Sequence, residues 1–208
     1  WQAMQDFTLS RDSNTADEIW LLEHPPLYTL GRNGKTEHLL NPGEIPVIHI
    51  DRGGQVTYHG PGQLIAYILI DLKRSNLGVR ELVSGIENSL IHTLNHFQLN
   101  AYAKKSAPGV YIDEAKIAAL GLRIKKGCSF HGLSLNIDMD LAPFKQINPC
   151  GYPDLEVIQL ADLIEKASLP EVSTLLIKHF IRFLGVEQTI WKDALPEAAR
   201  YDFNLSSA

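Results

Sequence analysis

The residues best suited to chemistry in this sequence centre on Cys150, in the tetrapeptide Asn148-Pro149-Cys150-Gly151. Pro149 fixes its own φ and Gly151 permits backbone angles that other residues avoid, so we expect the thiol to lie on a tight bend. A free thiol is mostly protonated at neutral pH and needs a nearby cation or base to act as a nucleophile. The pattern indicates a nucleophile or acyl carrier, with packing in the core as the alternative.

Several side chains are candidates for activating that thiol. Lys116 opens the apolar run from 116 to 122, and a lysine beside a thiol favours the thiolate. Partial burial would also let its amine lose a proton and act as a base, although an exposed strand-edge charge is the simpler interpretation of this lysine alone. His59 and His131 are alternatives, because a Cys–His–Asp triad would do the same task. Cys128 starts a predicted strand, and we interpret it as a packing residue.

A glycine-rich segment from Arg52 to Gln63 could bring backbone close to a ligand. Gly53-Gly54 offers amide donors in a tight turn, and a second turn follows at Gly60-Pro61-Gly62. The segment lacks the spacing of a phosphate-binding P-loop and of a dinucleotide-binding turn. A plain hairpin is the alternative interpretation.

The run from His131 to Asp138 predicts a strand with two different faces. Leu133, Leu135 and Ile137 alternate toward a core, which leaves Gly132, Ser134 and Asn136 on the other face. A small and polar strand face suits a bound substrate better than a packed interior.

Hydrophobic periodicity predicts the elements that position these residues. We expect strands at 19–22, 27–30, 47–50, 64–72, 109–112, 116–124 and 128–137, and helices at 1–12, 79–97, 159–167 and 171–184. Strands and helices do not alternate strictly, so we predict one α+β domain over residues 1–208, with a mixed, mostly antiparallel sheet and flanking helices.

Composition excludes several classes of protein. The chain has 208 residues, two cysteines and a net charge of -5, which argues against a disulfide framework and against nucleic-acid binding. No apolar run is long enough for a membrane span, and we expect a cytoplasmic protein. The residues His24, His49, His59, His131 and Cys150 lack the local spacing of metal ligands, so we expect no metal. Residues 101–130 hold six basic and two acidic side chains, a strip that could receive an acidic partner.

Five segments in register resemble the lipoyl(octanoyl) transferases. They are Arg52 to Gln63, Ala107 to Tyr111, Lys116 to Ile124, Cys128 to Asn136, and Asn148 to Gly151. The resemblance covers roughly residues 15–155. It implies an α/β sandwich fold like that of the biotin and lipoate protein ligase catalytic domain.

The resemblance also implies a reaction and a site. Octanoyl would pass from octanoyl-acyl carrier protein to a lysine of lipoyl domains, in 2-oxoacid dehydrogenase E2 subunits and the glycine cleavage H protein, without a cofactor. Cys150 matches the acyl-thioester cysteine of the family, and Lys116 matches the lysine that assists it. The matching substrate-contacting residues are Arg52, Gly53, Gly54, Gln55, Val56, Thr57, Tyr58 and His59, then Ala119, Leu120 and Gly121, then Gly132, Leu133 and Ser134.

Two other functions remain as alternatives. An ATP-dependent lipoate or biotin protein ligase would share the fold and the Arg-Gly-Gly segment, but would activate a free acid without a cysteine. A non-catalytic protein could bind acylated carriers or lipoyl domains. The fate of Cys150 distinguishes both from the transferase.

Overall fold

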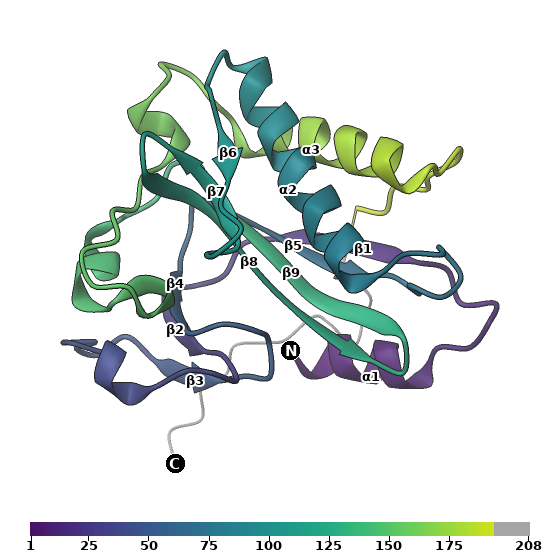
Figure 1. Ribbon diagram of the computed structural model, residues 1–208, viewed down its shortest axis with the longest axis horizontal. Coiled ribbons are helices and arrows are strands. Elements are labelled where there is room, and N and C mark those ends of the chain that lie inside the picture. Colours follow the sequence, from purple (N-terminus) through teal and green to yellow (C-terminus); the bar gives the residue numbers. More distant parts are fainter. Residues whose placement is uncertain (194–208) are drawn as a thin grey trace.

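The computed structural model describes residues 1–193, which form two β-sheets and three helices (Figure 1). The larger sheet has the strand order β1-β5-β9-β8-β7-β6 and the smaller one β3-β2-β4. The strands of the larger sheet are β1 (Glu18–Leu22), β5 (Gln63–Leu69), β6 (Tyr102–Ala103), β7 (Gly109–Ile112), β8 (Ala115–Lys125) and β9 (Cys128–Asn136), and those of the smaller sheet are β2 (Leu27–Leu30), β3 (Val47–His49) and β4 (Val56–His59). Among the described strands only β2 and β3 pair in parallel.

Helices cover both faces of the larger sheet. The helices α2 (Val79–His96) and α3 (Leu169–Leu184) pack on one face, where a stripe of fully buried leucines and isoleucines on α2 meets the sheet. The helix α1 (Gln2–Ser10) packs on the opposite face against Trp20, Leu69 and Phe130. Figure 1 shows the smaller sheet beside α1, below the long β8–β9 hairpin. None of the described helices is both long and apolar enough to cross a bilayer.

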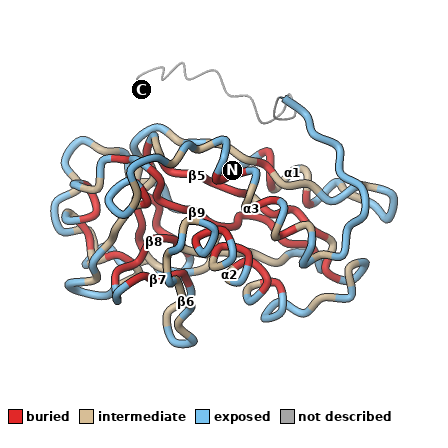
Figure 2. The backbone as a smooth tube through the Cα atoms, turned by 90° about the horizontal axis from the view of Figure 1, so that it is seen from above, coloured by how far each residue is buried: buried red, intermediate tan, exposed pale blue. Residues whose placement is uncertain are grey.

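Buried residues follow the central strands of the larger sheet, as the red segments of β5, β9, β8 and β7 in Figure 2 show. Every residue of β9 is buried, because helices cover one of its faces and α1 and the smaller sheet cover the other. A second core lies between the smaller sheet and the segment from 139 to 147, around Tyr28, Tyr58 and Phe144.

The predicted fold class is confirmed, and most predicted elements lie within two or three residues of the observed ones. The helix predicted at 159–167 is wrong, because only a single 3-10 turn forms there, at Leu160–Asp162. The helix after it begins earlier than predicted. Ser168 caps α3 by accepting a hydrogen bond from the Glu171 amide. Pro170 lies in the first turn, where a backbone N–H would have no partner within the helix, so proline is tolerated there.

The hairpin considered for the glycine-rich segment is absent. The strand β4 pairs with β2, whereas β5 pairs with β1 and β9, so the turn at residues 60–62 carries the chain from one sheet to the other. The glycine-rich segment therefore runs from the smaller sheet to the larger one, at the place where the two sheets meet.

The basic strip predicted at residues 101–130 is not one continuous surface. Lys116 is buried, and Lys125 lies nine residues further along β8, which corresponds to about 30 Å of strand. Lys126 then contacts the end of α1, through a bond to the Leu9 carbonyl. The structure therefore divides these charges between opposite ends of the hairpin.

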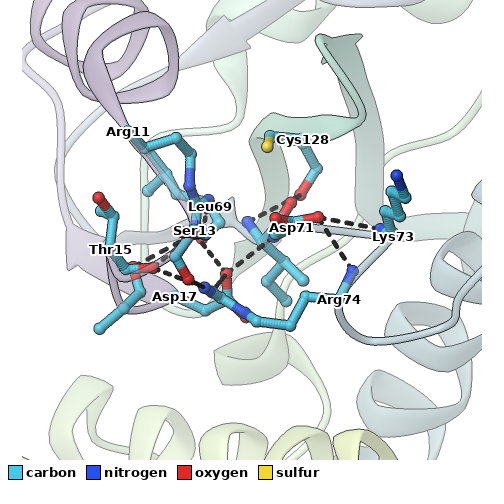
Figure 3. A network of polar contacts seen from close by, with 12 residues as sticks. Arg11, Ser13, Thr15, Asp17, Leu69, Asp71, Lys73, Arg74 and Cys128 are labelled. Atoms are coloured by element: carbon cyan, nitrogen blue, oxygen red, sulfur yellow. Dashed lines mark hydrogen bonds and ion pairs between the residues drawn. The ribbon is translucent and has the colours of Figure 1, made fainter.

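An ion-pair cluster fixes the chain between α1 and β1 to the end of β5 (Figure 3). The Asp17 carboxylate accepts from Arg11 at 2.6 Å, from Arg74 at 2.7 Å and from the Asp71 amide at 2.8 Å. Cys128 lies beside this cluster in Figure 3, and its backbone bridges to Asp71.

Candidate active site

The Cys150 thiol lies on a tight turn, as its neighbours in the sequence predict. Residues Pro149–Gly151 form one 3-10 turn in which Cys150 itself has φ 58°, a left-handed value that is uncommon outside glycine. Gly151 follows with φ 80°, and its amide donates to the Asn148 carbonyl at 2.9 Å. The turn leaves Cys150 partly exposed to solvent.

Lys116 reaches that sulfur from β8. Its Nζ donates to the Cys150 Sγ at 3.1 Å and to the Pro108 carbonyl at 3.1 Å. The same nitrogen stands 5.2 Å from the centre of the Tyr111 ring. The lysine is only 4% exposed, so a strand-edge charge in solvent is excluded. A cation and a thiol in this arrangement form an ion pair when the thiol ionises.

A shift in strand register turns Lys116 toward the site. Tyr111 pairs with Lys116 across β7 and β8, but the next pair joins Val110 to Ala118, so Ile117 has no cross-strand partner. This extra residue places Lys116 on the same face as Ala119, although they are three positions apart. In a regular strand the lysine would share the face of Ala118, which packs in the core beneath α2.

The segment after the nucleophile holds the backbone of the lysine. The Lys116 amide donates to the Glu156 carbonyl at 2.8 Å, and the Lys116 carbonyl accepts from the Ile158 amide at 3.0 Å. Pairing between β8 and β9 starts only at Ala118, so this segment takes the place of β9 beside Lys116. Loop residues near Cys150 therefore also fix the strand end that carries its partner.

The charge state of Lys116 depends on the sulfur. Burial by itself lowers the pKa of the Lys116 amine, but the attraction of the Cys150 sulfur and its hydrogen bond outweigh burial, so the pKa is raised. The amine is thus an ammonium while the sulfur carries negative charge. When the sulfur loses its negative charge, burial becomes the largest influence on the pKa of Lys116, and burial favours the neutral amine.

A small cavity opens beside the pair. It is lined by Thr57, Lys116, Ile117, Ala118, Ala119, Ser134, Asn136, Phe144, Pro149, Cys150 and Val157. Its free volume is about 10 Å³, which is room for roughly one water molecule. Ser134 and Asn136 come from the small, polar face predicted for β9, and Leu133 and Leu135 of the other face lie in the core as expected.

The predicted substrate-contacting segments divide between this cavity and the cores. Thr57, Ala119 and Ser134 line the cavity. The side chains of Val56 and Tyr58 lie in the core of the smaller sheet, and those of Leu120 and Leu133 pack on the helix side of the larger one. Each of the three segments thus contributes one residue to the lining of the cavity.

The glycines of these segments allow close backbone contact. The Gly53 amide donates to the Leu122 carbonyl at 3.0 Å, so it is not the free amide donor that its sequence context suggested. A Cβ on Gly121 would stand 2.9 Å from the Gly53 carbonyl, and one on Gly132 would stand 1.9 Å from the Ala66 carbonyl. Gly54 has φ 91°, and Gln55 lies against Gly151.

Arg52 is held inside the protein by oxygen atoms of its own segment and of β2. Its guanidinium donates to Thr29 Oγ1, to the Thr29 carbonyl at 2.7 Å, to the Gln55 carbonyl at 2.8 Å and to the Gly53 carbonyl at 2.9 Å. Burial lowers the pKa of Arg52 to about 10, so the group stays charged at neutral pH. The arginine organises the glycine turn.

His59 is part of a continuous hydrogen-bond chain and has no free ring nitrogen. Its Nε2 lies 3.2 Å from Thr29 Oγ1 and its Nδ1 lies 2.7 Å from the Gln63 side-chain oxygen. The Gln63 amide group donates to Asn136 at 2.8 Å, and Asn136 donates to the Ile158 carbonyl at 3.0 Å. Burial lowers the pKa of His59 to about 3, which keeps the ring neutral.

His131 does not form the alternative triad either. Its Nε2 lies 2.9 Å from the Asp51 carboxylate, and its ring stacks on Phe130. Burial lowers the pKa of His131, although Asp51 opposes the effect. The group within hydrogen-bond distance of the Cys150 sulfur is Lys116. Residues 1–193 contain no group of three or more histidine, cysteine, aspartate or glutamate side chains placed to hold a metal.

Comparison with known proteins places the chain in a family. The family model for the lipoyl protein ligase A/B catalytic domain matches residues 1–181. The chain belongs to this family.

The chain also has relatives of high identity. The octanoyltransferase of Shewanella frigidimarina is 58% identical over 197 residues, which are 95% of this chain and 91% of the relative. That of Vibrio cholerae O395 is 62% identical over 188 residues, which are 90% of this chain and 87% of the relative. The predicted family and its enzymatic, acyl-transferring character are confirmed.

Solved structures of low sequence identity share the fold. A lipoate-protein ligase A bound with ATP superposes with a TM-score of 0.75 at 16% identity, over 93% of this chain and 82% of the ligase. A bipartite lipoate protein ligase from Thermoplasma acidophilum gives 0.73 at 17% identity, over 95% and 84%. At such identities the likeness concerns the fold alone.

Sequence reasoning missed three groups that contact the candidate site. Tyr111, the Pro108 carbonyl and Thr29 were not candidates, although each contacts Lys116 or Arg52. Pro108-Gly109 could have indicated a turn with an exposed carbonyl. Thr29 lies inside an apolar strand, and nothing in its sequence context marks it.

Proposed function

We propose that this protein is an octanoyltransferase that moves an octanoyl group from acyl carrier protein to a lysine of lipoyl domains, through a thioester on Cys150. The observation that carries the proposal is the distance of 3.1 Å between Lys116 Nζ and Cys150 Sγ. The acceptors are lipoyl domains of 2-oxoacid dehydrogenase E2 subunits and the glycine cleavage H protein. The proposal places the enzyme in the cytoplasm, where a cysteine nucleophile stays reduced.

In the first step the Cys150 thiolate attacks the carbonyl carbon of the donor thioester. The bond from Sγ to that carbon forms, the bond from the carbon to the carrier sulfur breaks, and the leaving carrier thiolate takes the proton of the Lys116 ammonium, which leaves Lys116 as a neutral amine. One thioester replaces another, so the step runs near equilibrium and needs no nucleotide. The Lys116 ammonium stabilises the thiolate before the attack.

In the second step the neutral amine of the acceptor lysine attacks the Cys150 thioester. The carbon–nitrogen bond forms, the carbon–sulfur bond breaks, and Lys116 takes a proton from the attacking nitrogen. Lys116 can do so because the acylated sulfur carries no charge and burial favours its neutral amine. The step restores the thiolate and the ammonium together, and conversion of a thioester to an amide drives it forward.

The acyl chain needs more space than the cavity provides in this conformation. About seven apolar carbons at about 0.8 kcal/mol each would contribute roughly 5 kcal/mol on burial. The lining side chains must therefore move apart to admit the chain, and binding energy of that size is available to drive the movement. The cavity walls from Thr57, Ala119 and Ser134 are where we place the start of the acyl chain.

Intact-protein mass measurement tests the function. The purified protein is incubated with octanoyl-acyl carrier protein and no ATP, and we expect a mass gain of one octanoyl group, mapped by peptide analysis to Cys150. Adding a lipoyl domain should then transfer the group to the domain. Cys150→Ser is the control and should show neither event.

The same experiment rejects the alternatives. ATP-dependent attachment of free octanoate, with no adduct on Cys150, would identify a ligase. Binding to both partners that persists in Cys150→Ser, without any transfer by the wild type, would identify a non-catalytic binding protein.

A further inference from the structure

Three consecutive carbonyls of the loop between β6 and β7 accept hydrogen bonds from side chains around the site. The Ser106 carbonyl accepts from the Tyr152 hydroxyl at 3.4 Å and the Ala107 carbonyl from the Tyr111 hydroxyl at 2.9 Å. The Pro108 carbonyl accepts from Lys116 Nζ at 3.1 Å. The backbone of this loop is thus positioned by residues that flank the nucleophile and its partner.

The loop has little backbone support of its own between these contacts. Its internal backbone bond joins the Ala107 amide to the Lys104 carbonyl at 3.3 Å. Tyr111 supplies the firmest of the surrounding contacts, because its side chain is 1% exposed and its position in β7 is fixed by pairing with β8. The Tyr111 ring also lies beneath two lysines, 4.4 Å from Lys104 Nζ and 5.2 Å from Lys116 Nζ.

We propose that the Pro108 carbonyl orients Lys116 as a general base, and that Tyr111 is the positioning residue that holds this carbonyl in place. The proposal rests on the proposed function and adds a third member to the pair. An activated nucleophile commonly has a base, and that base is in turn held by a third group. Here the third group is the main-chain oxygen of Pro108, so the identity of the side chain at position 108 does not indicate this role.

The geometry gives the carbonyl a specific task in the second step. A neutral Lys116 amine has two N–H groups and one lone pair. One N–H bonded to the Pro108 carbonyl limits rotation of the amine and leaves the lone pair for the proton of the attacking nitrogen. That proton ends on Lys116, while the Pro108 carbonyl keeps the bond it already accepts and Tyr111 exchanges no proton.

The two half-reactions differ in how much they need this orientation. Stabilisation of a thiolate by an ammonium depends on distance and only weakly on direction. Proton transfer requires alignment of donor and acceptor, as hydrogen bonds do. Loosening the carbonyl should therefore slow octanoyl transfer from Cys150 to the acceptor more than acylation of Cys150 by the donor.

Single-turnover kinetics on Tyr111→Phe test the inference. The variant keeps the ring beside Lys116 and loses the hydroxyl, with both its bond to the Ala107 carbonyl and its interaction with Lys116. Tyr152→Phe, which acts on the loop through the Ser106 carbonyl, separates the two effects. We expect transfer at saturating lipoyl domain to slow by about fivefold, the effect of one neutral hydrogen bond, with an unchanged KM for that domain. Acylation should stay within about twofold of wild type.

Tyr102→Phe is the matched control. The Tyr102 ring lies 6.1 Å from that of Tyr111, but its hydroxyl bonds to Glu114 and does not contact the loop carbonyls named above. Both half-reactions should be unchanged in this variant. Tyr152→Phe frees the Ser106 carbonyl from a side chain that is 47% exposed, where folding is not at risk. It should show the same selective slowing, by about twofold.

The inference would be overturned if Tyr111→Phe slowed both half-reactions equally. It would also be overturned if neither Tyr111→Phe nor Tyr152→Phe slowed transfer to the acceptor more than acylation. A wild-type protein that never acquires octanoyl on Cys150 would instead overturn the proposed function. A wild type that completes both half-reactions, beside a Tyr111→Phe variant that completes both at the wild-type rates, would remove only the role of the Pro108 carbonyl.

Discussion

Gly109 lies directly against the side chain of Lys116. A Cβ on Gly109 would stand 2.9 Å from Lys116 Cε, 3.1 Å from its Nζ and 2.7 Å from the Ala118 carbonyl. Gly109 also has φ 142°, and Glu87 of α2 binds its amide at 3.1 Å. The absence of a side chain at Gly109 thus leaves the space that the Lys116 side chain occupies beside Cys150.

Substitution Gly109→Ala should therefore displace Lys116 from Cys150. We expect at least a tenfold loss of octanoyl transfer, because contacts below 3.0 Å force a shift and a small misplacement of a catalytic group is costly. Gly127→Ala is the control, since Gly127 also has a positive φ, 81°, but a Cβ there meets nothing within 4 Å. That variant should lose stability through backbone strain and keep its activity. Full activity in Gly109→Ala would show that Lys116 does not need the space left by Gly109.

Substitution Lys116→Arg keeps a positive charge and removes the base. Arginine does not lose its proton in proteins, so transfer to the acceptor should fall by about a hundredfold or more. Acylation of Cys150, which needs only the charge, should fall less. Lys125→Arg, at the exposed end of the same strand, is the control and should behave as wild type. Rates of transfer near those of wild type in Lys116→Arg would mean that Lys116 acts only by its charge.

Substitution Cys128→Ala should leave transfer intact. Cys128 is 5% exposed, and burial raises the pKa of its thiol, so it stays protonated and unreactive. Iodoacetamide at neutral pH should modify Cys150 in wild type and in Cys128→Ala, as read by peptide mass, and should leave Cys150→Ala unlabelled. Loss of transfer in Cys128→Ala, with a normal melting temperature, would contradict this assignment.

Stability should fall below about pH 6.5 because buried histidines cannot take up protons. Burial lowers the pKa of His24 to about 4 and that of His59 to about 3. The unfolded chain binds protons at these side chains from about pH 6.5 downward, and the folded chain does not. The stabilising effect is complete above about pH 6.5 and is lost as the pH falls toward the folded values.

Urea unfolding between pH 7.5 and 4.5 measures this effect. Each histidine should lower the free energy of unfolding by up to about 1.4 kcal/mol per pH unit in the lower part of that range. His49→Gln, at an exposed position of β3, should keep the same slope. A free energy of unfolding that does not change over the range would refute the burial argument.

The sequence predicted the elements of this fold better than it predicted which face each residue takes. Apolar alternation placed Leu133 and Leu135 correctly in the core. It could not place Lys116, because the unpaired Ile117 reverses the alternation at that point, and such a register shift depends on pairing with β7. The hairpin interpretation of the glycine-rich segment was wrong for a similar reason, because β4 pairs with β2, which is distant in sequence.

The site was predicted as far as local chemistry allows. The Pro–Cys–Gly bend follows from the backbone preferences of three adjacent residues. The contact between Cys150 and Lys116 was implied by family resemblance and not by spacing, because 34 positions separate them. Carbonyl groups such as that of Pro108 carry no sequence signature, so their roles emerge only from the folded chain.

The segment from 149 to 158 carries the sulfur near its start, and near its end it forms hydrogen bonds with the backbone of Lys116. One segment therefore fixes both the sulfur and the strand end that carries the amine, whereas the side chains of Thr57 and Ser134 belong to the strands β4 and β9, outside this segment. With the acyl chain placed along Thr57 and Ser134 as we propose, we expect substitutions at these two positions to change the preferred length of the fatty acid while the contact between Cys150 and Lys116 is kept. Chain-length preference and reactivity would then be open to separate change by directed evolution.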